Sequence, residues 1–129
     1  MNDQAFTDAL GEVRNGTDGF HFNPLYRWME YSDGVQEVAE TGCYWLLDIL
    51  GTELRVKLRA LNIPYVMLNV SVVTKDGKAK ITATTATTGD DVPPIYTKKI
   101  GYTDMPNCKW DMLLTYEDDK GRLILVTEY

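Results

Sequence analysis

The hydrophobic pattern of this chain changes its period near Tyr65, and this change constrains the fold most. Before it, apolar residues recur at helical spacing, whereas Val66, Leu68, Val70 and Val72 alternate with other residues, as in a strand with one buried face. Helices followed by strands indicate segregated layers. The sequence therefore predicts a single α+β domain, with N-terminal helices packed on a C-terminal antiparallel sheet of four or five strands.

The helical half divides into three predicted segments. An apolar stripe predicts a short helix at 3–13. The next helix is expected to start at Asp33 as N-cap, with Gln36 at the capping-box position. Gly51 is expected to end it in the left-handed conformation of a C′ residue. A further helix is predicted at 53–61, where alternation of apolar residues also permits a strand.

The second half contains signals for five strands joined by turns. The Asp-Gly pair at 76–77 and the polar run at 117–121 are typical of hairpin turns. Short turns between consecutive strands predict an antiparallel meander. The strands are expected to start at Tyr65, to span 79–87, 95–102 and 122–128, and to include a fourth with Trp110, Met112, Leu114 and Tyr116 on one face.

The net charge of −6 is unevenly distributed along the chain. Residues 1–53 hold ten acidic and two basic residues, while the remainder is slightly basic. An acidic half argues against direct nucleic-acid binding and favours a basic protein partner, although surface acids also serve solubility alone. No apolar run reaches the roughly 18 residues of a membrane span, and the acidic N-terminus is not a signal peptide. We expect a cytoplasmic protein with free Cys43 and Cys108.

Motifs of catalysis and cofactor binding are missing from the sequence. It contains neither the phosphate-binding loop nor the dinucleotide fingerprint, and His21 is its only histidine. Two cysteines and one histidine without paired spacing do not make a zinc site. The sequence therefore predicts no metal, no cofactor and a non-catalytic protein, and a small enzyme stays an alternative.

Two groups of residues are candidates for binding. One helix face gathers four acids around a tyrosine, and its simplest alternative interpretation is a solvated polar face. We call this group, which comprises Asp33, Glu37, Glu40, Tyr44 and Asp48, the acidic face. The second group consists of the aromatic residues Tyr26, Trp28 and Tyr31, which could line a pocket or serve as core residues.

Several short strings of the chain resemble a known family. They are Tyr-Ser-Asp-Gly-Val at 31–35 with Tyr-Trp-Leu-Leu-Asp at 44–48, Ile-Gly-Tyr-Thr-Asp-Met-Pro at 100–106, and the terminal Glu-Tyr. Tyr-Arg-Trp at 26–28 precedes the first of these strings. Together they resemble domain of unknown function 6876, found in bacteria and often on phages and mobile elements. The chain departs from that family at Met105, where phenylalanine is more common, and in a longer 51–64 segment.

The resemblance carries no assigned activity, but it implies an accessory or anti-defence role. Combined with the acidic half, it predicts a non-catalytic protein-binding module of a phage or mobile element, with an anti-CRISPR-like inhibitor as one form. The alternatives are a small enzyme or small-molecule binder with an aromatic pocket, and a structural or oligomeric phage component.

Overall fold

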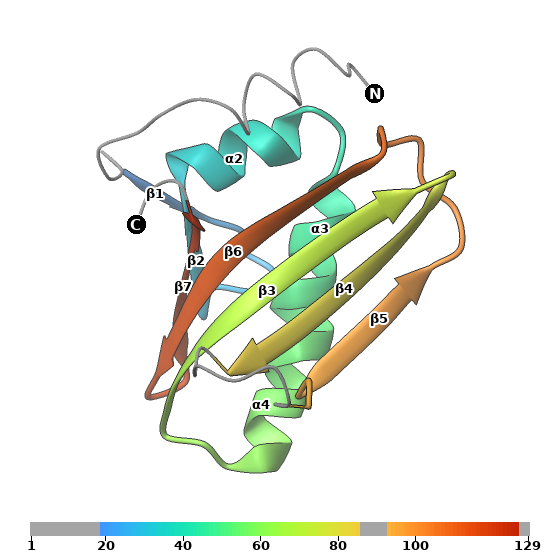
Figure 1. The fold of residues 1–129 in the computed structure, drawn as a ribbon. Coiled ribbons are helices and arrows are strands. Elements are labelled where there is room, and N and C mark those ends of the chain that lie inside the picture. The colour runs from blue at the N-terminus through green and yellow to red at the C-terminus, as the bar shows by residue number, and fades with distance from the viewer. Residues whose placement is uncertain (1–18, 86–92, 127–129) are drawn as a thin grey trace.

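The fold is built on one twisted sheet of seven strands (Figure 1). The computed structural model describes residues 19–85 and 93–126. The strand order across the sheet is β1-β2-β7-β6-β3-β4-β5. The β2–β7 pair is parallel, and the other neighbouring pairs are antiparallel. The strands are β1 (Phe20–Phe22), β2 (Met29–Ser32), β3 (Tyr65–Lys75), β4 (Lys78–Thr85), β5 (Tyr96–Ile100), β6 (Cys108–Glu117) and β7 (Lys120–Leu125).

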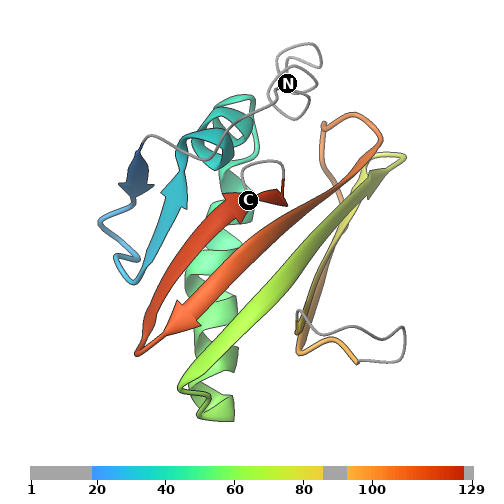
Figure 2. The same cartoon turned by 60° about the vertical axis from the view of Figure 1, so that its left-hand side comes forward.

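The described helices lie on one face of this sheet. Helix α2 spans Asp33–Glu40, and after a turn the chain continues as α3 (Tyr44–Ile49), a π-helical segment η1 (Leu50–Leu54) and α4 (Arg55–Leu61). The last three run on as one long helix, which lies behind the strands in both Figure 1 and Figure 2. The opposite sheet face carries no described helix, and no described helix is long and apolar enough to cross a membrane.

The core forms between this long helix and the sheet. Alternate residues of the central strands point toward the helix, as a period of two requires, and are almost fully buried. They meet a row of leucines on the helix that is equally inaccessible to solvent. The inward residues include Leu68, Val70, Val72, Ile81, Met112, Leu114 and Leu123, and the helical leucines are Leu47, Leu50, Leu54 and Leu58.

The predicted fold class, with helices confined to the N-terminal half and strands to the C-terminal half, is wrong. Instead of helices packed on a sheet of four or five C-terminal strands, the structure is mostly sheet, and two of its seven strands come from the N-terminal half. Strands β1 and β2 contain three and four residues, too few to establish an alternating pattern. The predicted all-antiparallel sheet is also wrong, because β2 pairs in parallel with β7 at the end of the chain.

The predicted meander is wrong at β6. This strand does not pair with β5, which precedes it, but with β3, through ten residue pairs from Tyr65 to Thr74. The two predicted hairpin turns are present. Asp76 and Gly77 have positive φ angles of 53° and 77°, and Asp118 and Asp119 have φ angles of 51° and 64°. Left-handed pairs of this kind match the twist of the strands that they connect.

Several predicted helix boundaries are corrected by the structure. The N-cap of α2 is Ser32, whose Oγ accepts from the Val35 amide at 3.3 Å, and not Asp33. The glycine that ends this helix in a positive-φ conformation is Gly42, at φ 128°, and not Gly51. The helical interpretation of 53–61 is confirmed by α4. The helix predicted at 3–13 lies outside the described residues.

Gly51 lies inside η1, where close packing and not a left-handed conformation accounts for the glycine. A Cβ atom built on Gly51 would come within 2.4 Å of two ring carbons of Tyr26, closer than real side chains approach. The carbonyl of Gly51 also accepts a 2.7 Å hydrogen bond from the indole nitrogen of Trp28. Glycine here allows two buried aromatic side chains to lie directly against the helix backbone.

Candidate functional site

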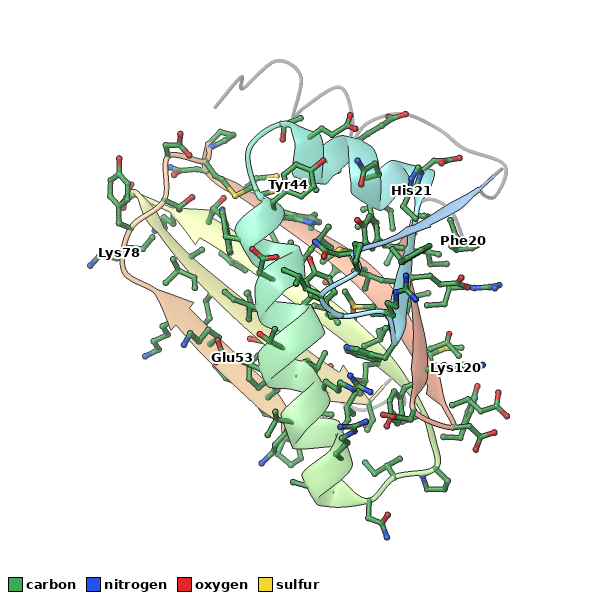
Figure 3. The ribbon with its side chains drawn as sticks, turned by 180° about the vertical axis from the view of Figure 1, so that it is seen from behind. Phe20, His21, Tyr44, Glu53, Lys78 and Lys120 are labelled. Atoms are coloured by element: carbon green, nitrogen blue, oxygen red, sulfur yellow. The ribbon has the colours of Figure 1, made fainter. Side chains whose placement is uncertain are left out.

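The acidic face extends over two helices and the turn between them. Helix α2 ends at Glu40, and the turn that follows brings the start of α3 close to Gln36, which contacts residues of both helices. Its Nε2 donates to Glu40 Oε1 at 2.8 Å and to the Tyr44 hydroxyl at 3.0 Å. Figure 3 shows Tyr44 where the two helices meet. Its side chain is 44% exposed, and Asp48, one turn further along α3, is also exposed.

Asp48 connects the acidic face to one of the buried aromatic residues. The hydroxyl of Tyr26 donates to Asp48 Oδ1 at 3.0 Å. Burial, followed by this hydrogen bond and the nearby carboxylate charge, raises the pKa of Tyr26. Burial also raises the pKa of Tyr31, with smaller contributions from Tyr44 and Asp48. The hydrogen bond between Tyr26 and Asp48 therefore joins members of the two predicted groups.

His21 extends this surface toward the edge of the sheet. Its Nε2 lies 2.7 Å from Asp33 Oδ1, and its ring stacks on Tyr31 with centroids 6.1 Å apart and planes at 22°. His21 and Tyr31 are register partners on β1 and β2, so both side chains leave the same sheet face. Sequence reasoning did not connect His21 with Asp33, since β1 is too short to show which way its side chains point.

The predicted pocket residues Tyr26, Trp28 and Tyr31 are all buried. Tyr26 packs on Gly51, and Trp28 donates to the Gly51 carbonyl and meets Tyr116 edge-on. Tyr26 and Trp28 therefore pack against the helix backbone, and the Tyr26 hydroxyl and the Trp28 indole nitrogen each donate a hydrogen bond. A pocket role for these side chains stays a prediction.

A hollow of about 1100 Å³ lies near the β6–β7 hairpin, and of the three predicted pocket residues Trp28 lines it. Its walls carry charged side chains of both signs, several of which neutralise one another. Arg122 Nε approaches Glu30 Oε1 at 2.6 Å, and Arg55 Nη2 approaches Asp119 Oδ2 at 3.0 Å. The full lining is Arg27, Trp28, Glu30, Arg55, Thr115, Glu117, Asp118, Asp119, Lys120, Gly121 and Arg122.

Asp119, in the turn between β6 and β7, bonds this hairpin to α4. Besides Arg55, it accepts from Arg59 Nε at 3.1 Å and Nη2 at 2.6 Å, and from the Tyr116 hydroxyl at 3.2 Å. Hydrogen bonds from Arg59 and then Arg55 hold the pKa of Asp119 well below its usual range. Because this network ties a turn to a helix, we interpret it as structural.

These sites present hydrogen-bonding groups, charged side chains and aromatic rings. Over residues 19–85 and 93–126, no three metal-ligating side chains gather closely enough to hold an ion. Cys43 and Cys108 are free thiols, and burial raises the pKa of Cys43 to about 12, so that this thiol is a poor nucleophile.

Comparison with known proteins identifies the chain only at the level of its family. Neither the curated proteins nor the solved structures contain a match. The model of a family of unknown function, DUF6876, matches residues 6–129. This match covers nearly the whole sequence, so the protein belongs to the DUF6876 family.

Proposed function

We propose that the protein is a non-catalytic protein-binding module whose acidic face docks a basic partner, with Tyr44 as the anchor. The exposure of Tyr44 is the observation that carries the proposal. Tyrosine is favoured in binding surfaces because its large, stiff ring offers apolar area and a hydroxyl at little entropic cost. Here the Gln36 amide already orients the hydroxyl, so that little freedom remains to be lost on binding.

The charges around Tyr44 supply the preference for a basic partner. Glu40 is bonded to the neutral amide of Gln36, and Asp48 to the neutral hydroxyl of Tyr26. These hydrogen bonds orient the carboxylates but leave their negative charge uncompensated. Charges at the rim of an interface mainly accelerate association and suppress wrong partners, whereas a central aromatic residue slows dissociation.

The proposal is tested first by capture from a lysate of the source organism. A protein retained by the wild type should be lost with Tyr44→Ala and kept with Tyr65→Ala, a matched control whose tyrosine is 54% exposed elsewhere on the fold. Truncating a central anchor typically costs about 2 kcal/mol, roughly a 30-fold loss of affinity. A partner retained equally by both variants would contradict a docking role for Tyr44.

The kinetics of the purified pair separate the two contributions. Glu37→Lys with Glu40→Lys should slow association and flatten its salt dependence, while Tyr44→Ala should mainly raise the dissociation rate. Glu117→Lys, an exposed acid on β6, is the charge control. An origin on a phage or mobile element, and an anti-defence role, stay predictions that the identity of the captured protein will test.

A further inference from the structure

A second charged surface lies on the open face of the sheet and is built from lysines. The register aligns Lys109, Val73, Lys80 and Lys99 in one row across β6, β3, β4 and β5. Val72, Ile81 and Trp110, their neighbours along these strands, are buried against the helix, so the row points the other way. Lys75 and Lys78 form a second pair beside it at the hairpin. We call Lys75, Lys78, Lys80, Lys99 and Lys109 the lysine strip.

The five lysines are exposed and carry concentrated positive charge. Within the described part of the chain, none of them forms an ion pair, in contrast to Lys98, which reaches Glu53 on the helix side at 3.3 Å. Two lysine pairs, 75 with 78 and 80 with 99, stand directly opposite each other in the register. Like charges in such positions destabilise a sheet, so the arrangement costs stability unless an anion neutralises it.

We propose that the lysine strip binds the phosphate backbone of a nucleic acid without reading its sequence. This surface is distinct from the acidic face and goes beyond the proposed function. Protein interfaces are depleted in lysine and need large apolar anchors, whereas the strip offers only Val73, which is 40% exposed. Nucleic-acid interfaces are polar and rich in positive charge, and lysine binds phosphate as a point charge.

Two acids lie beside the five lysines of the strip, Asp76 in the turn between Lys75 and Lys78 and Asp111 two residues after Lys109, and most of the other acids lie elsewhere. The carboxylates of the acidic face are carried by α2 and α3, which lie on the other side of the sheet (Figure 3). Across a layer of structure on the order of 10 Å, salt at physiological strength screens most of the interaction between exposed charges. The row spans three strand spacings, about 14 Å, and the two rows are about 7 Å apart, enough for several consecutive phosphates.

The salt dependence of binding gives a quantitative test. Five lysine–phosphate contacts on a single strand predict a slope of about −3.5 in log K against log salt, so that affinity falls about a hundredfold between 50 and 200 mM. Fluorescence anisotropy with labelled oligo(dT), and with a labelled duplex in parallel, measures this slope. Lys80→Gln with Lys99→Gln should weaken binding and reduce the slope to about −2.1.

Matched controls keep the result independent of folding. Lys57→Gln with Lys120→Gln removes as many charges, from α4 and from the start of β7. Figure 3 shows Lys120 and Lys78 on opposite sides of the molecule. These changes should leave binding intact, and Lys80→Gln with Lys99→Gln should not lower the melting temperature, because it relieves repulsion. The proposal is overturned if neither oligonucleotide binds at low salt, if both double variants lose affinity equally, or if polyglutamate binds as tightly as oligo(dT), which would indicate an acidic protein partner.

Discussion

Replacing Gly51 by alanine should destabilise the protein, although the same change within an ordinary helix is favourable. In a solvent-exposed helix, alanine is more stable than glycine by about 0.5–1 kcal/mol. At Gly51 the new Cβ would lie 2.4 Å from two ring carbons of Tyr26, against the 3.4 Å or more of ordinary contact, so the ring must move by about 1 Å. Tyr26 is only 3% exposed and has little room to do so.

The magnitude follows from what this movement disturbs. Overpacking a well-filled core costs about 1–3 kcal/mol, and weakening the hydrogen bond from Tyr26 to Asp48 adds about 0.5–1.5 kcal/mol. After subtraction of the helix-propensity gain, we expect a net loss of about 2 kcal/mol. For a domain of 129 residues this corresponds to a fall in melting temperature of roughly 6–8 °C. Urea unfolding followed by tryptophan fluorescence and circular dichroism measures it directly.

Two further variants isolate the steric cause. A Cβ on Gly101 meets no atom within 4 Å, so Gly101→Ala should change the free energy of unfolding by less than about 0.5 kcal/mol. In a Tyr26→Ala background, which itself costs about 3–5 kcal/mol, Gly51→Ala should become neutral or stabilising because the obstructing ring is gone. A higher melting temperature for Gly51→Ala in the wild-type background would refute the packing argument.

Two other predictions concern titrating groups. Burial raises the pKa of Cys43 to about 12, so this thiol should resist iodoacetamide at pH 8 until the protein is unfolded, whereas half-buried Cys108 should react in the native state. Mass spectrometry distinguishes the two labelled sites, and rapid labelling of Cys43 in the native protein would count against its burial. Asp119 has a lowered pKa in the folded state, so its contribution is present above the unfolded value of about 3.9 and is lost as pH falls below it. Asparagine tolerates the left-handed backbone conformation of Asp119, so Asp119→Asn removes the charge without straining the turn. This variant should lower the melting temperature at pH 7 more than at pH 3. Equal losses at both pH values would contradict a stabilising role for the charge of Asp119.

The sequence predicted local structure well where two signals agreed. At the β3–β4 hairpin, alternation on both strands and the Asp-Gly turn indicate the same register, and both turn residues adopt the expected positive φ. The side chains predicted to share one face of a strand are likewise all buried in the structure: Trp110, Met112, Leu114 and Tyr116. Pairing between distant strands left no comparable local signal. The contact of β2 with β7 joins Met29 to Gly121, and nothing near either residue specifies its partner.

The candidate sites show the same limit. Helical periodicity placed Glu40 near Tyr44, and the two remain neighbours because Gln36 bonds to both, even though Gly42 interrupts the predicted helix between them. The contact between Tyr26 and Asp48 spans 22 positions in the chain and depends on the close approach that Gly51 permits. Such contacts result from tertiary packing, which a periodic pattern along one segment does not contain.

The division of charge between two faces follows from the periods of the elements that carry it. In β4, Ala79 and Ile81 point into the core, so a strand period of two forces Lys78 and Lys80 onto the open face. In α2, burial of Val35 and Val38 leaves Glu37 and Glu40 toward the outside of the helix layer. A chain with a net charge of −6 thus carries two separate surfaces of opposite sign. Since exposed charges act over about one Debye length, a partner responds to the surface that it meets and not to this sum.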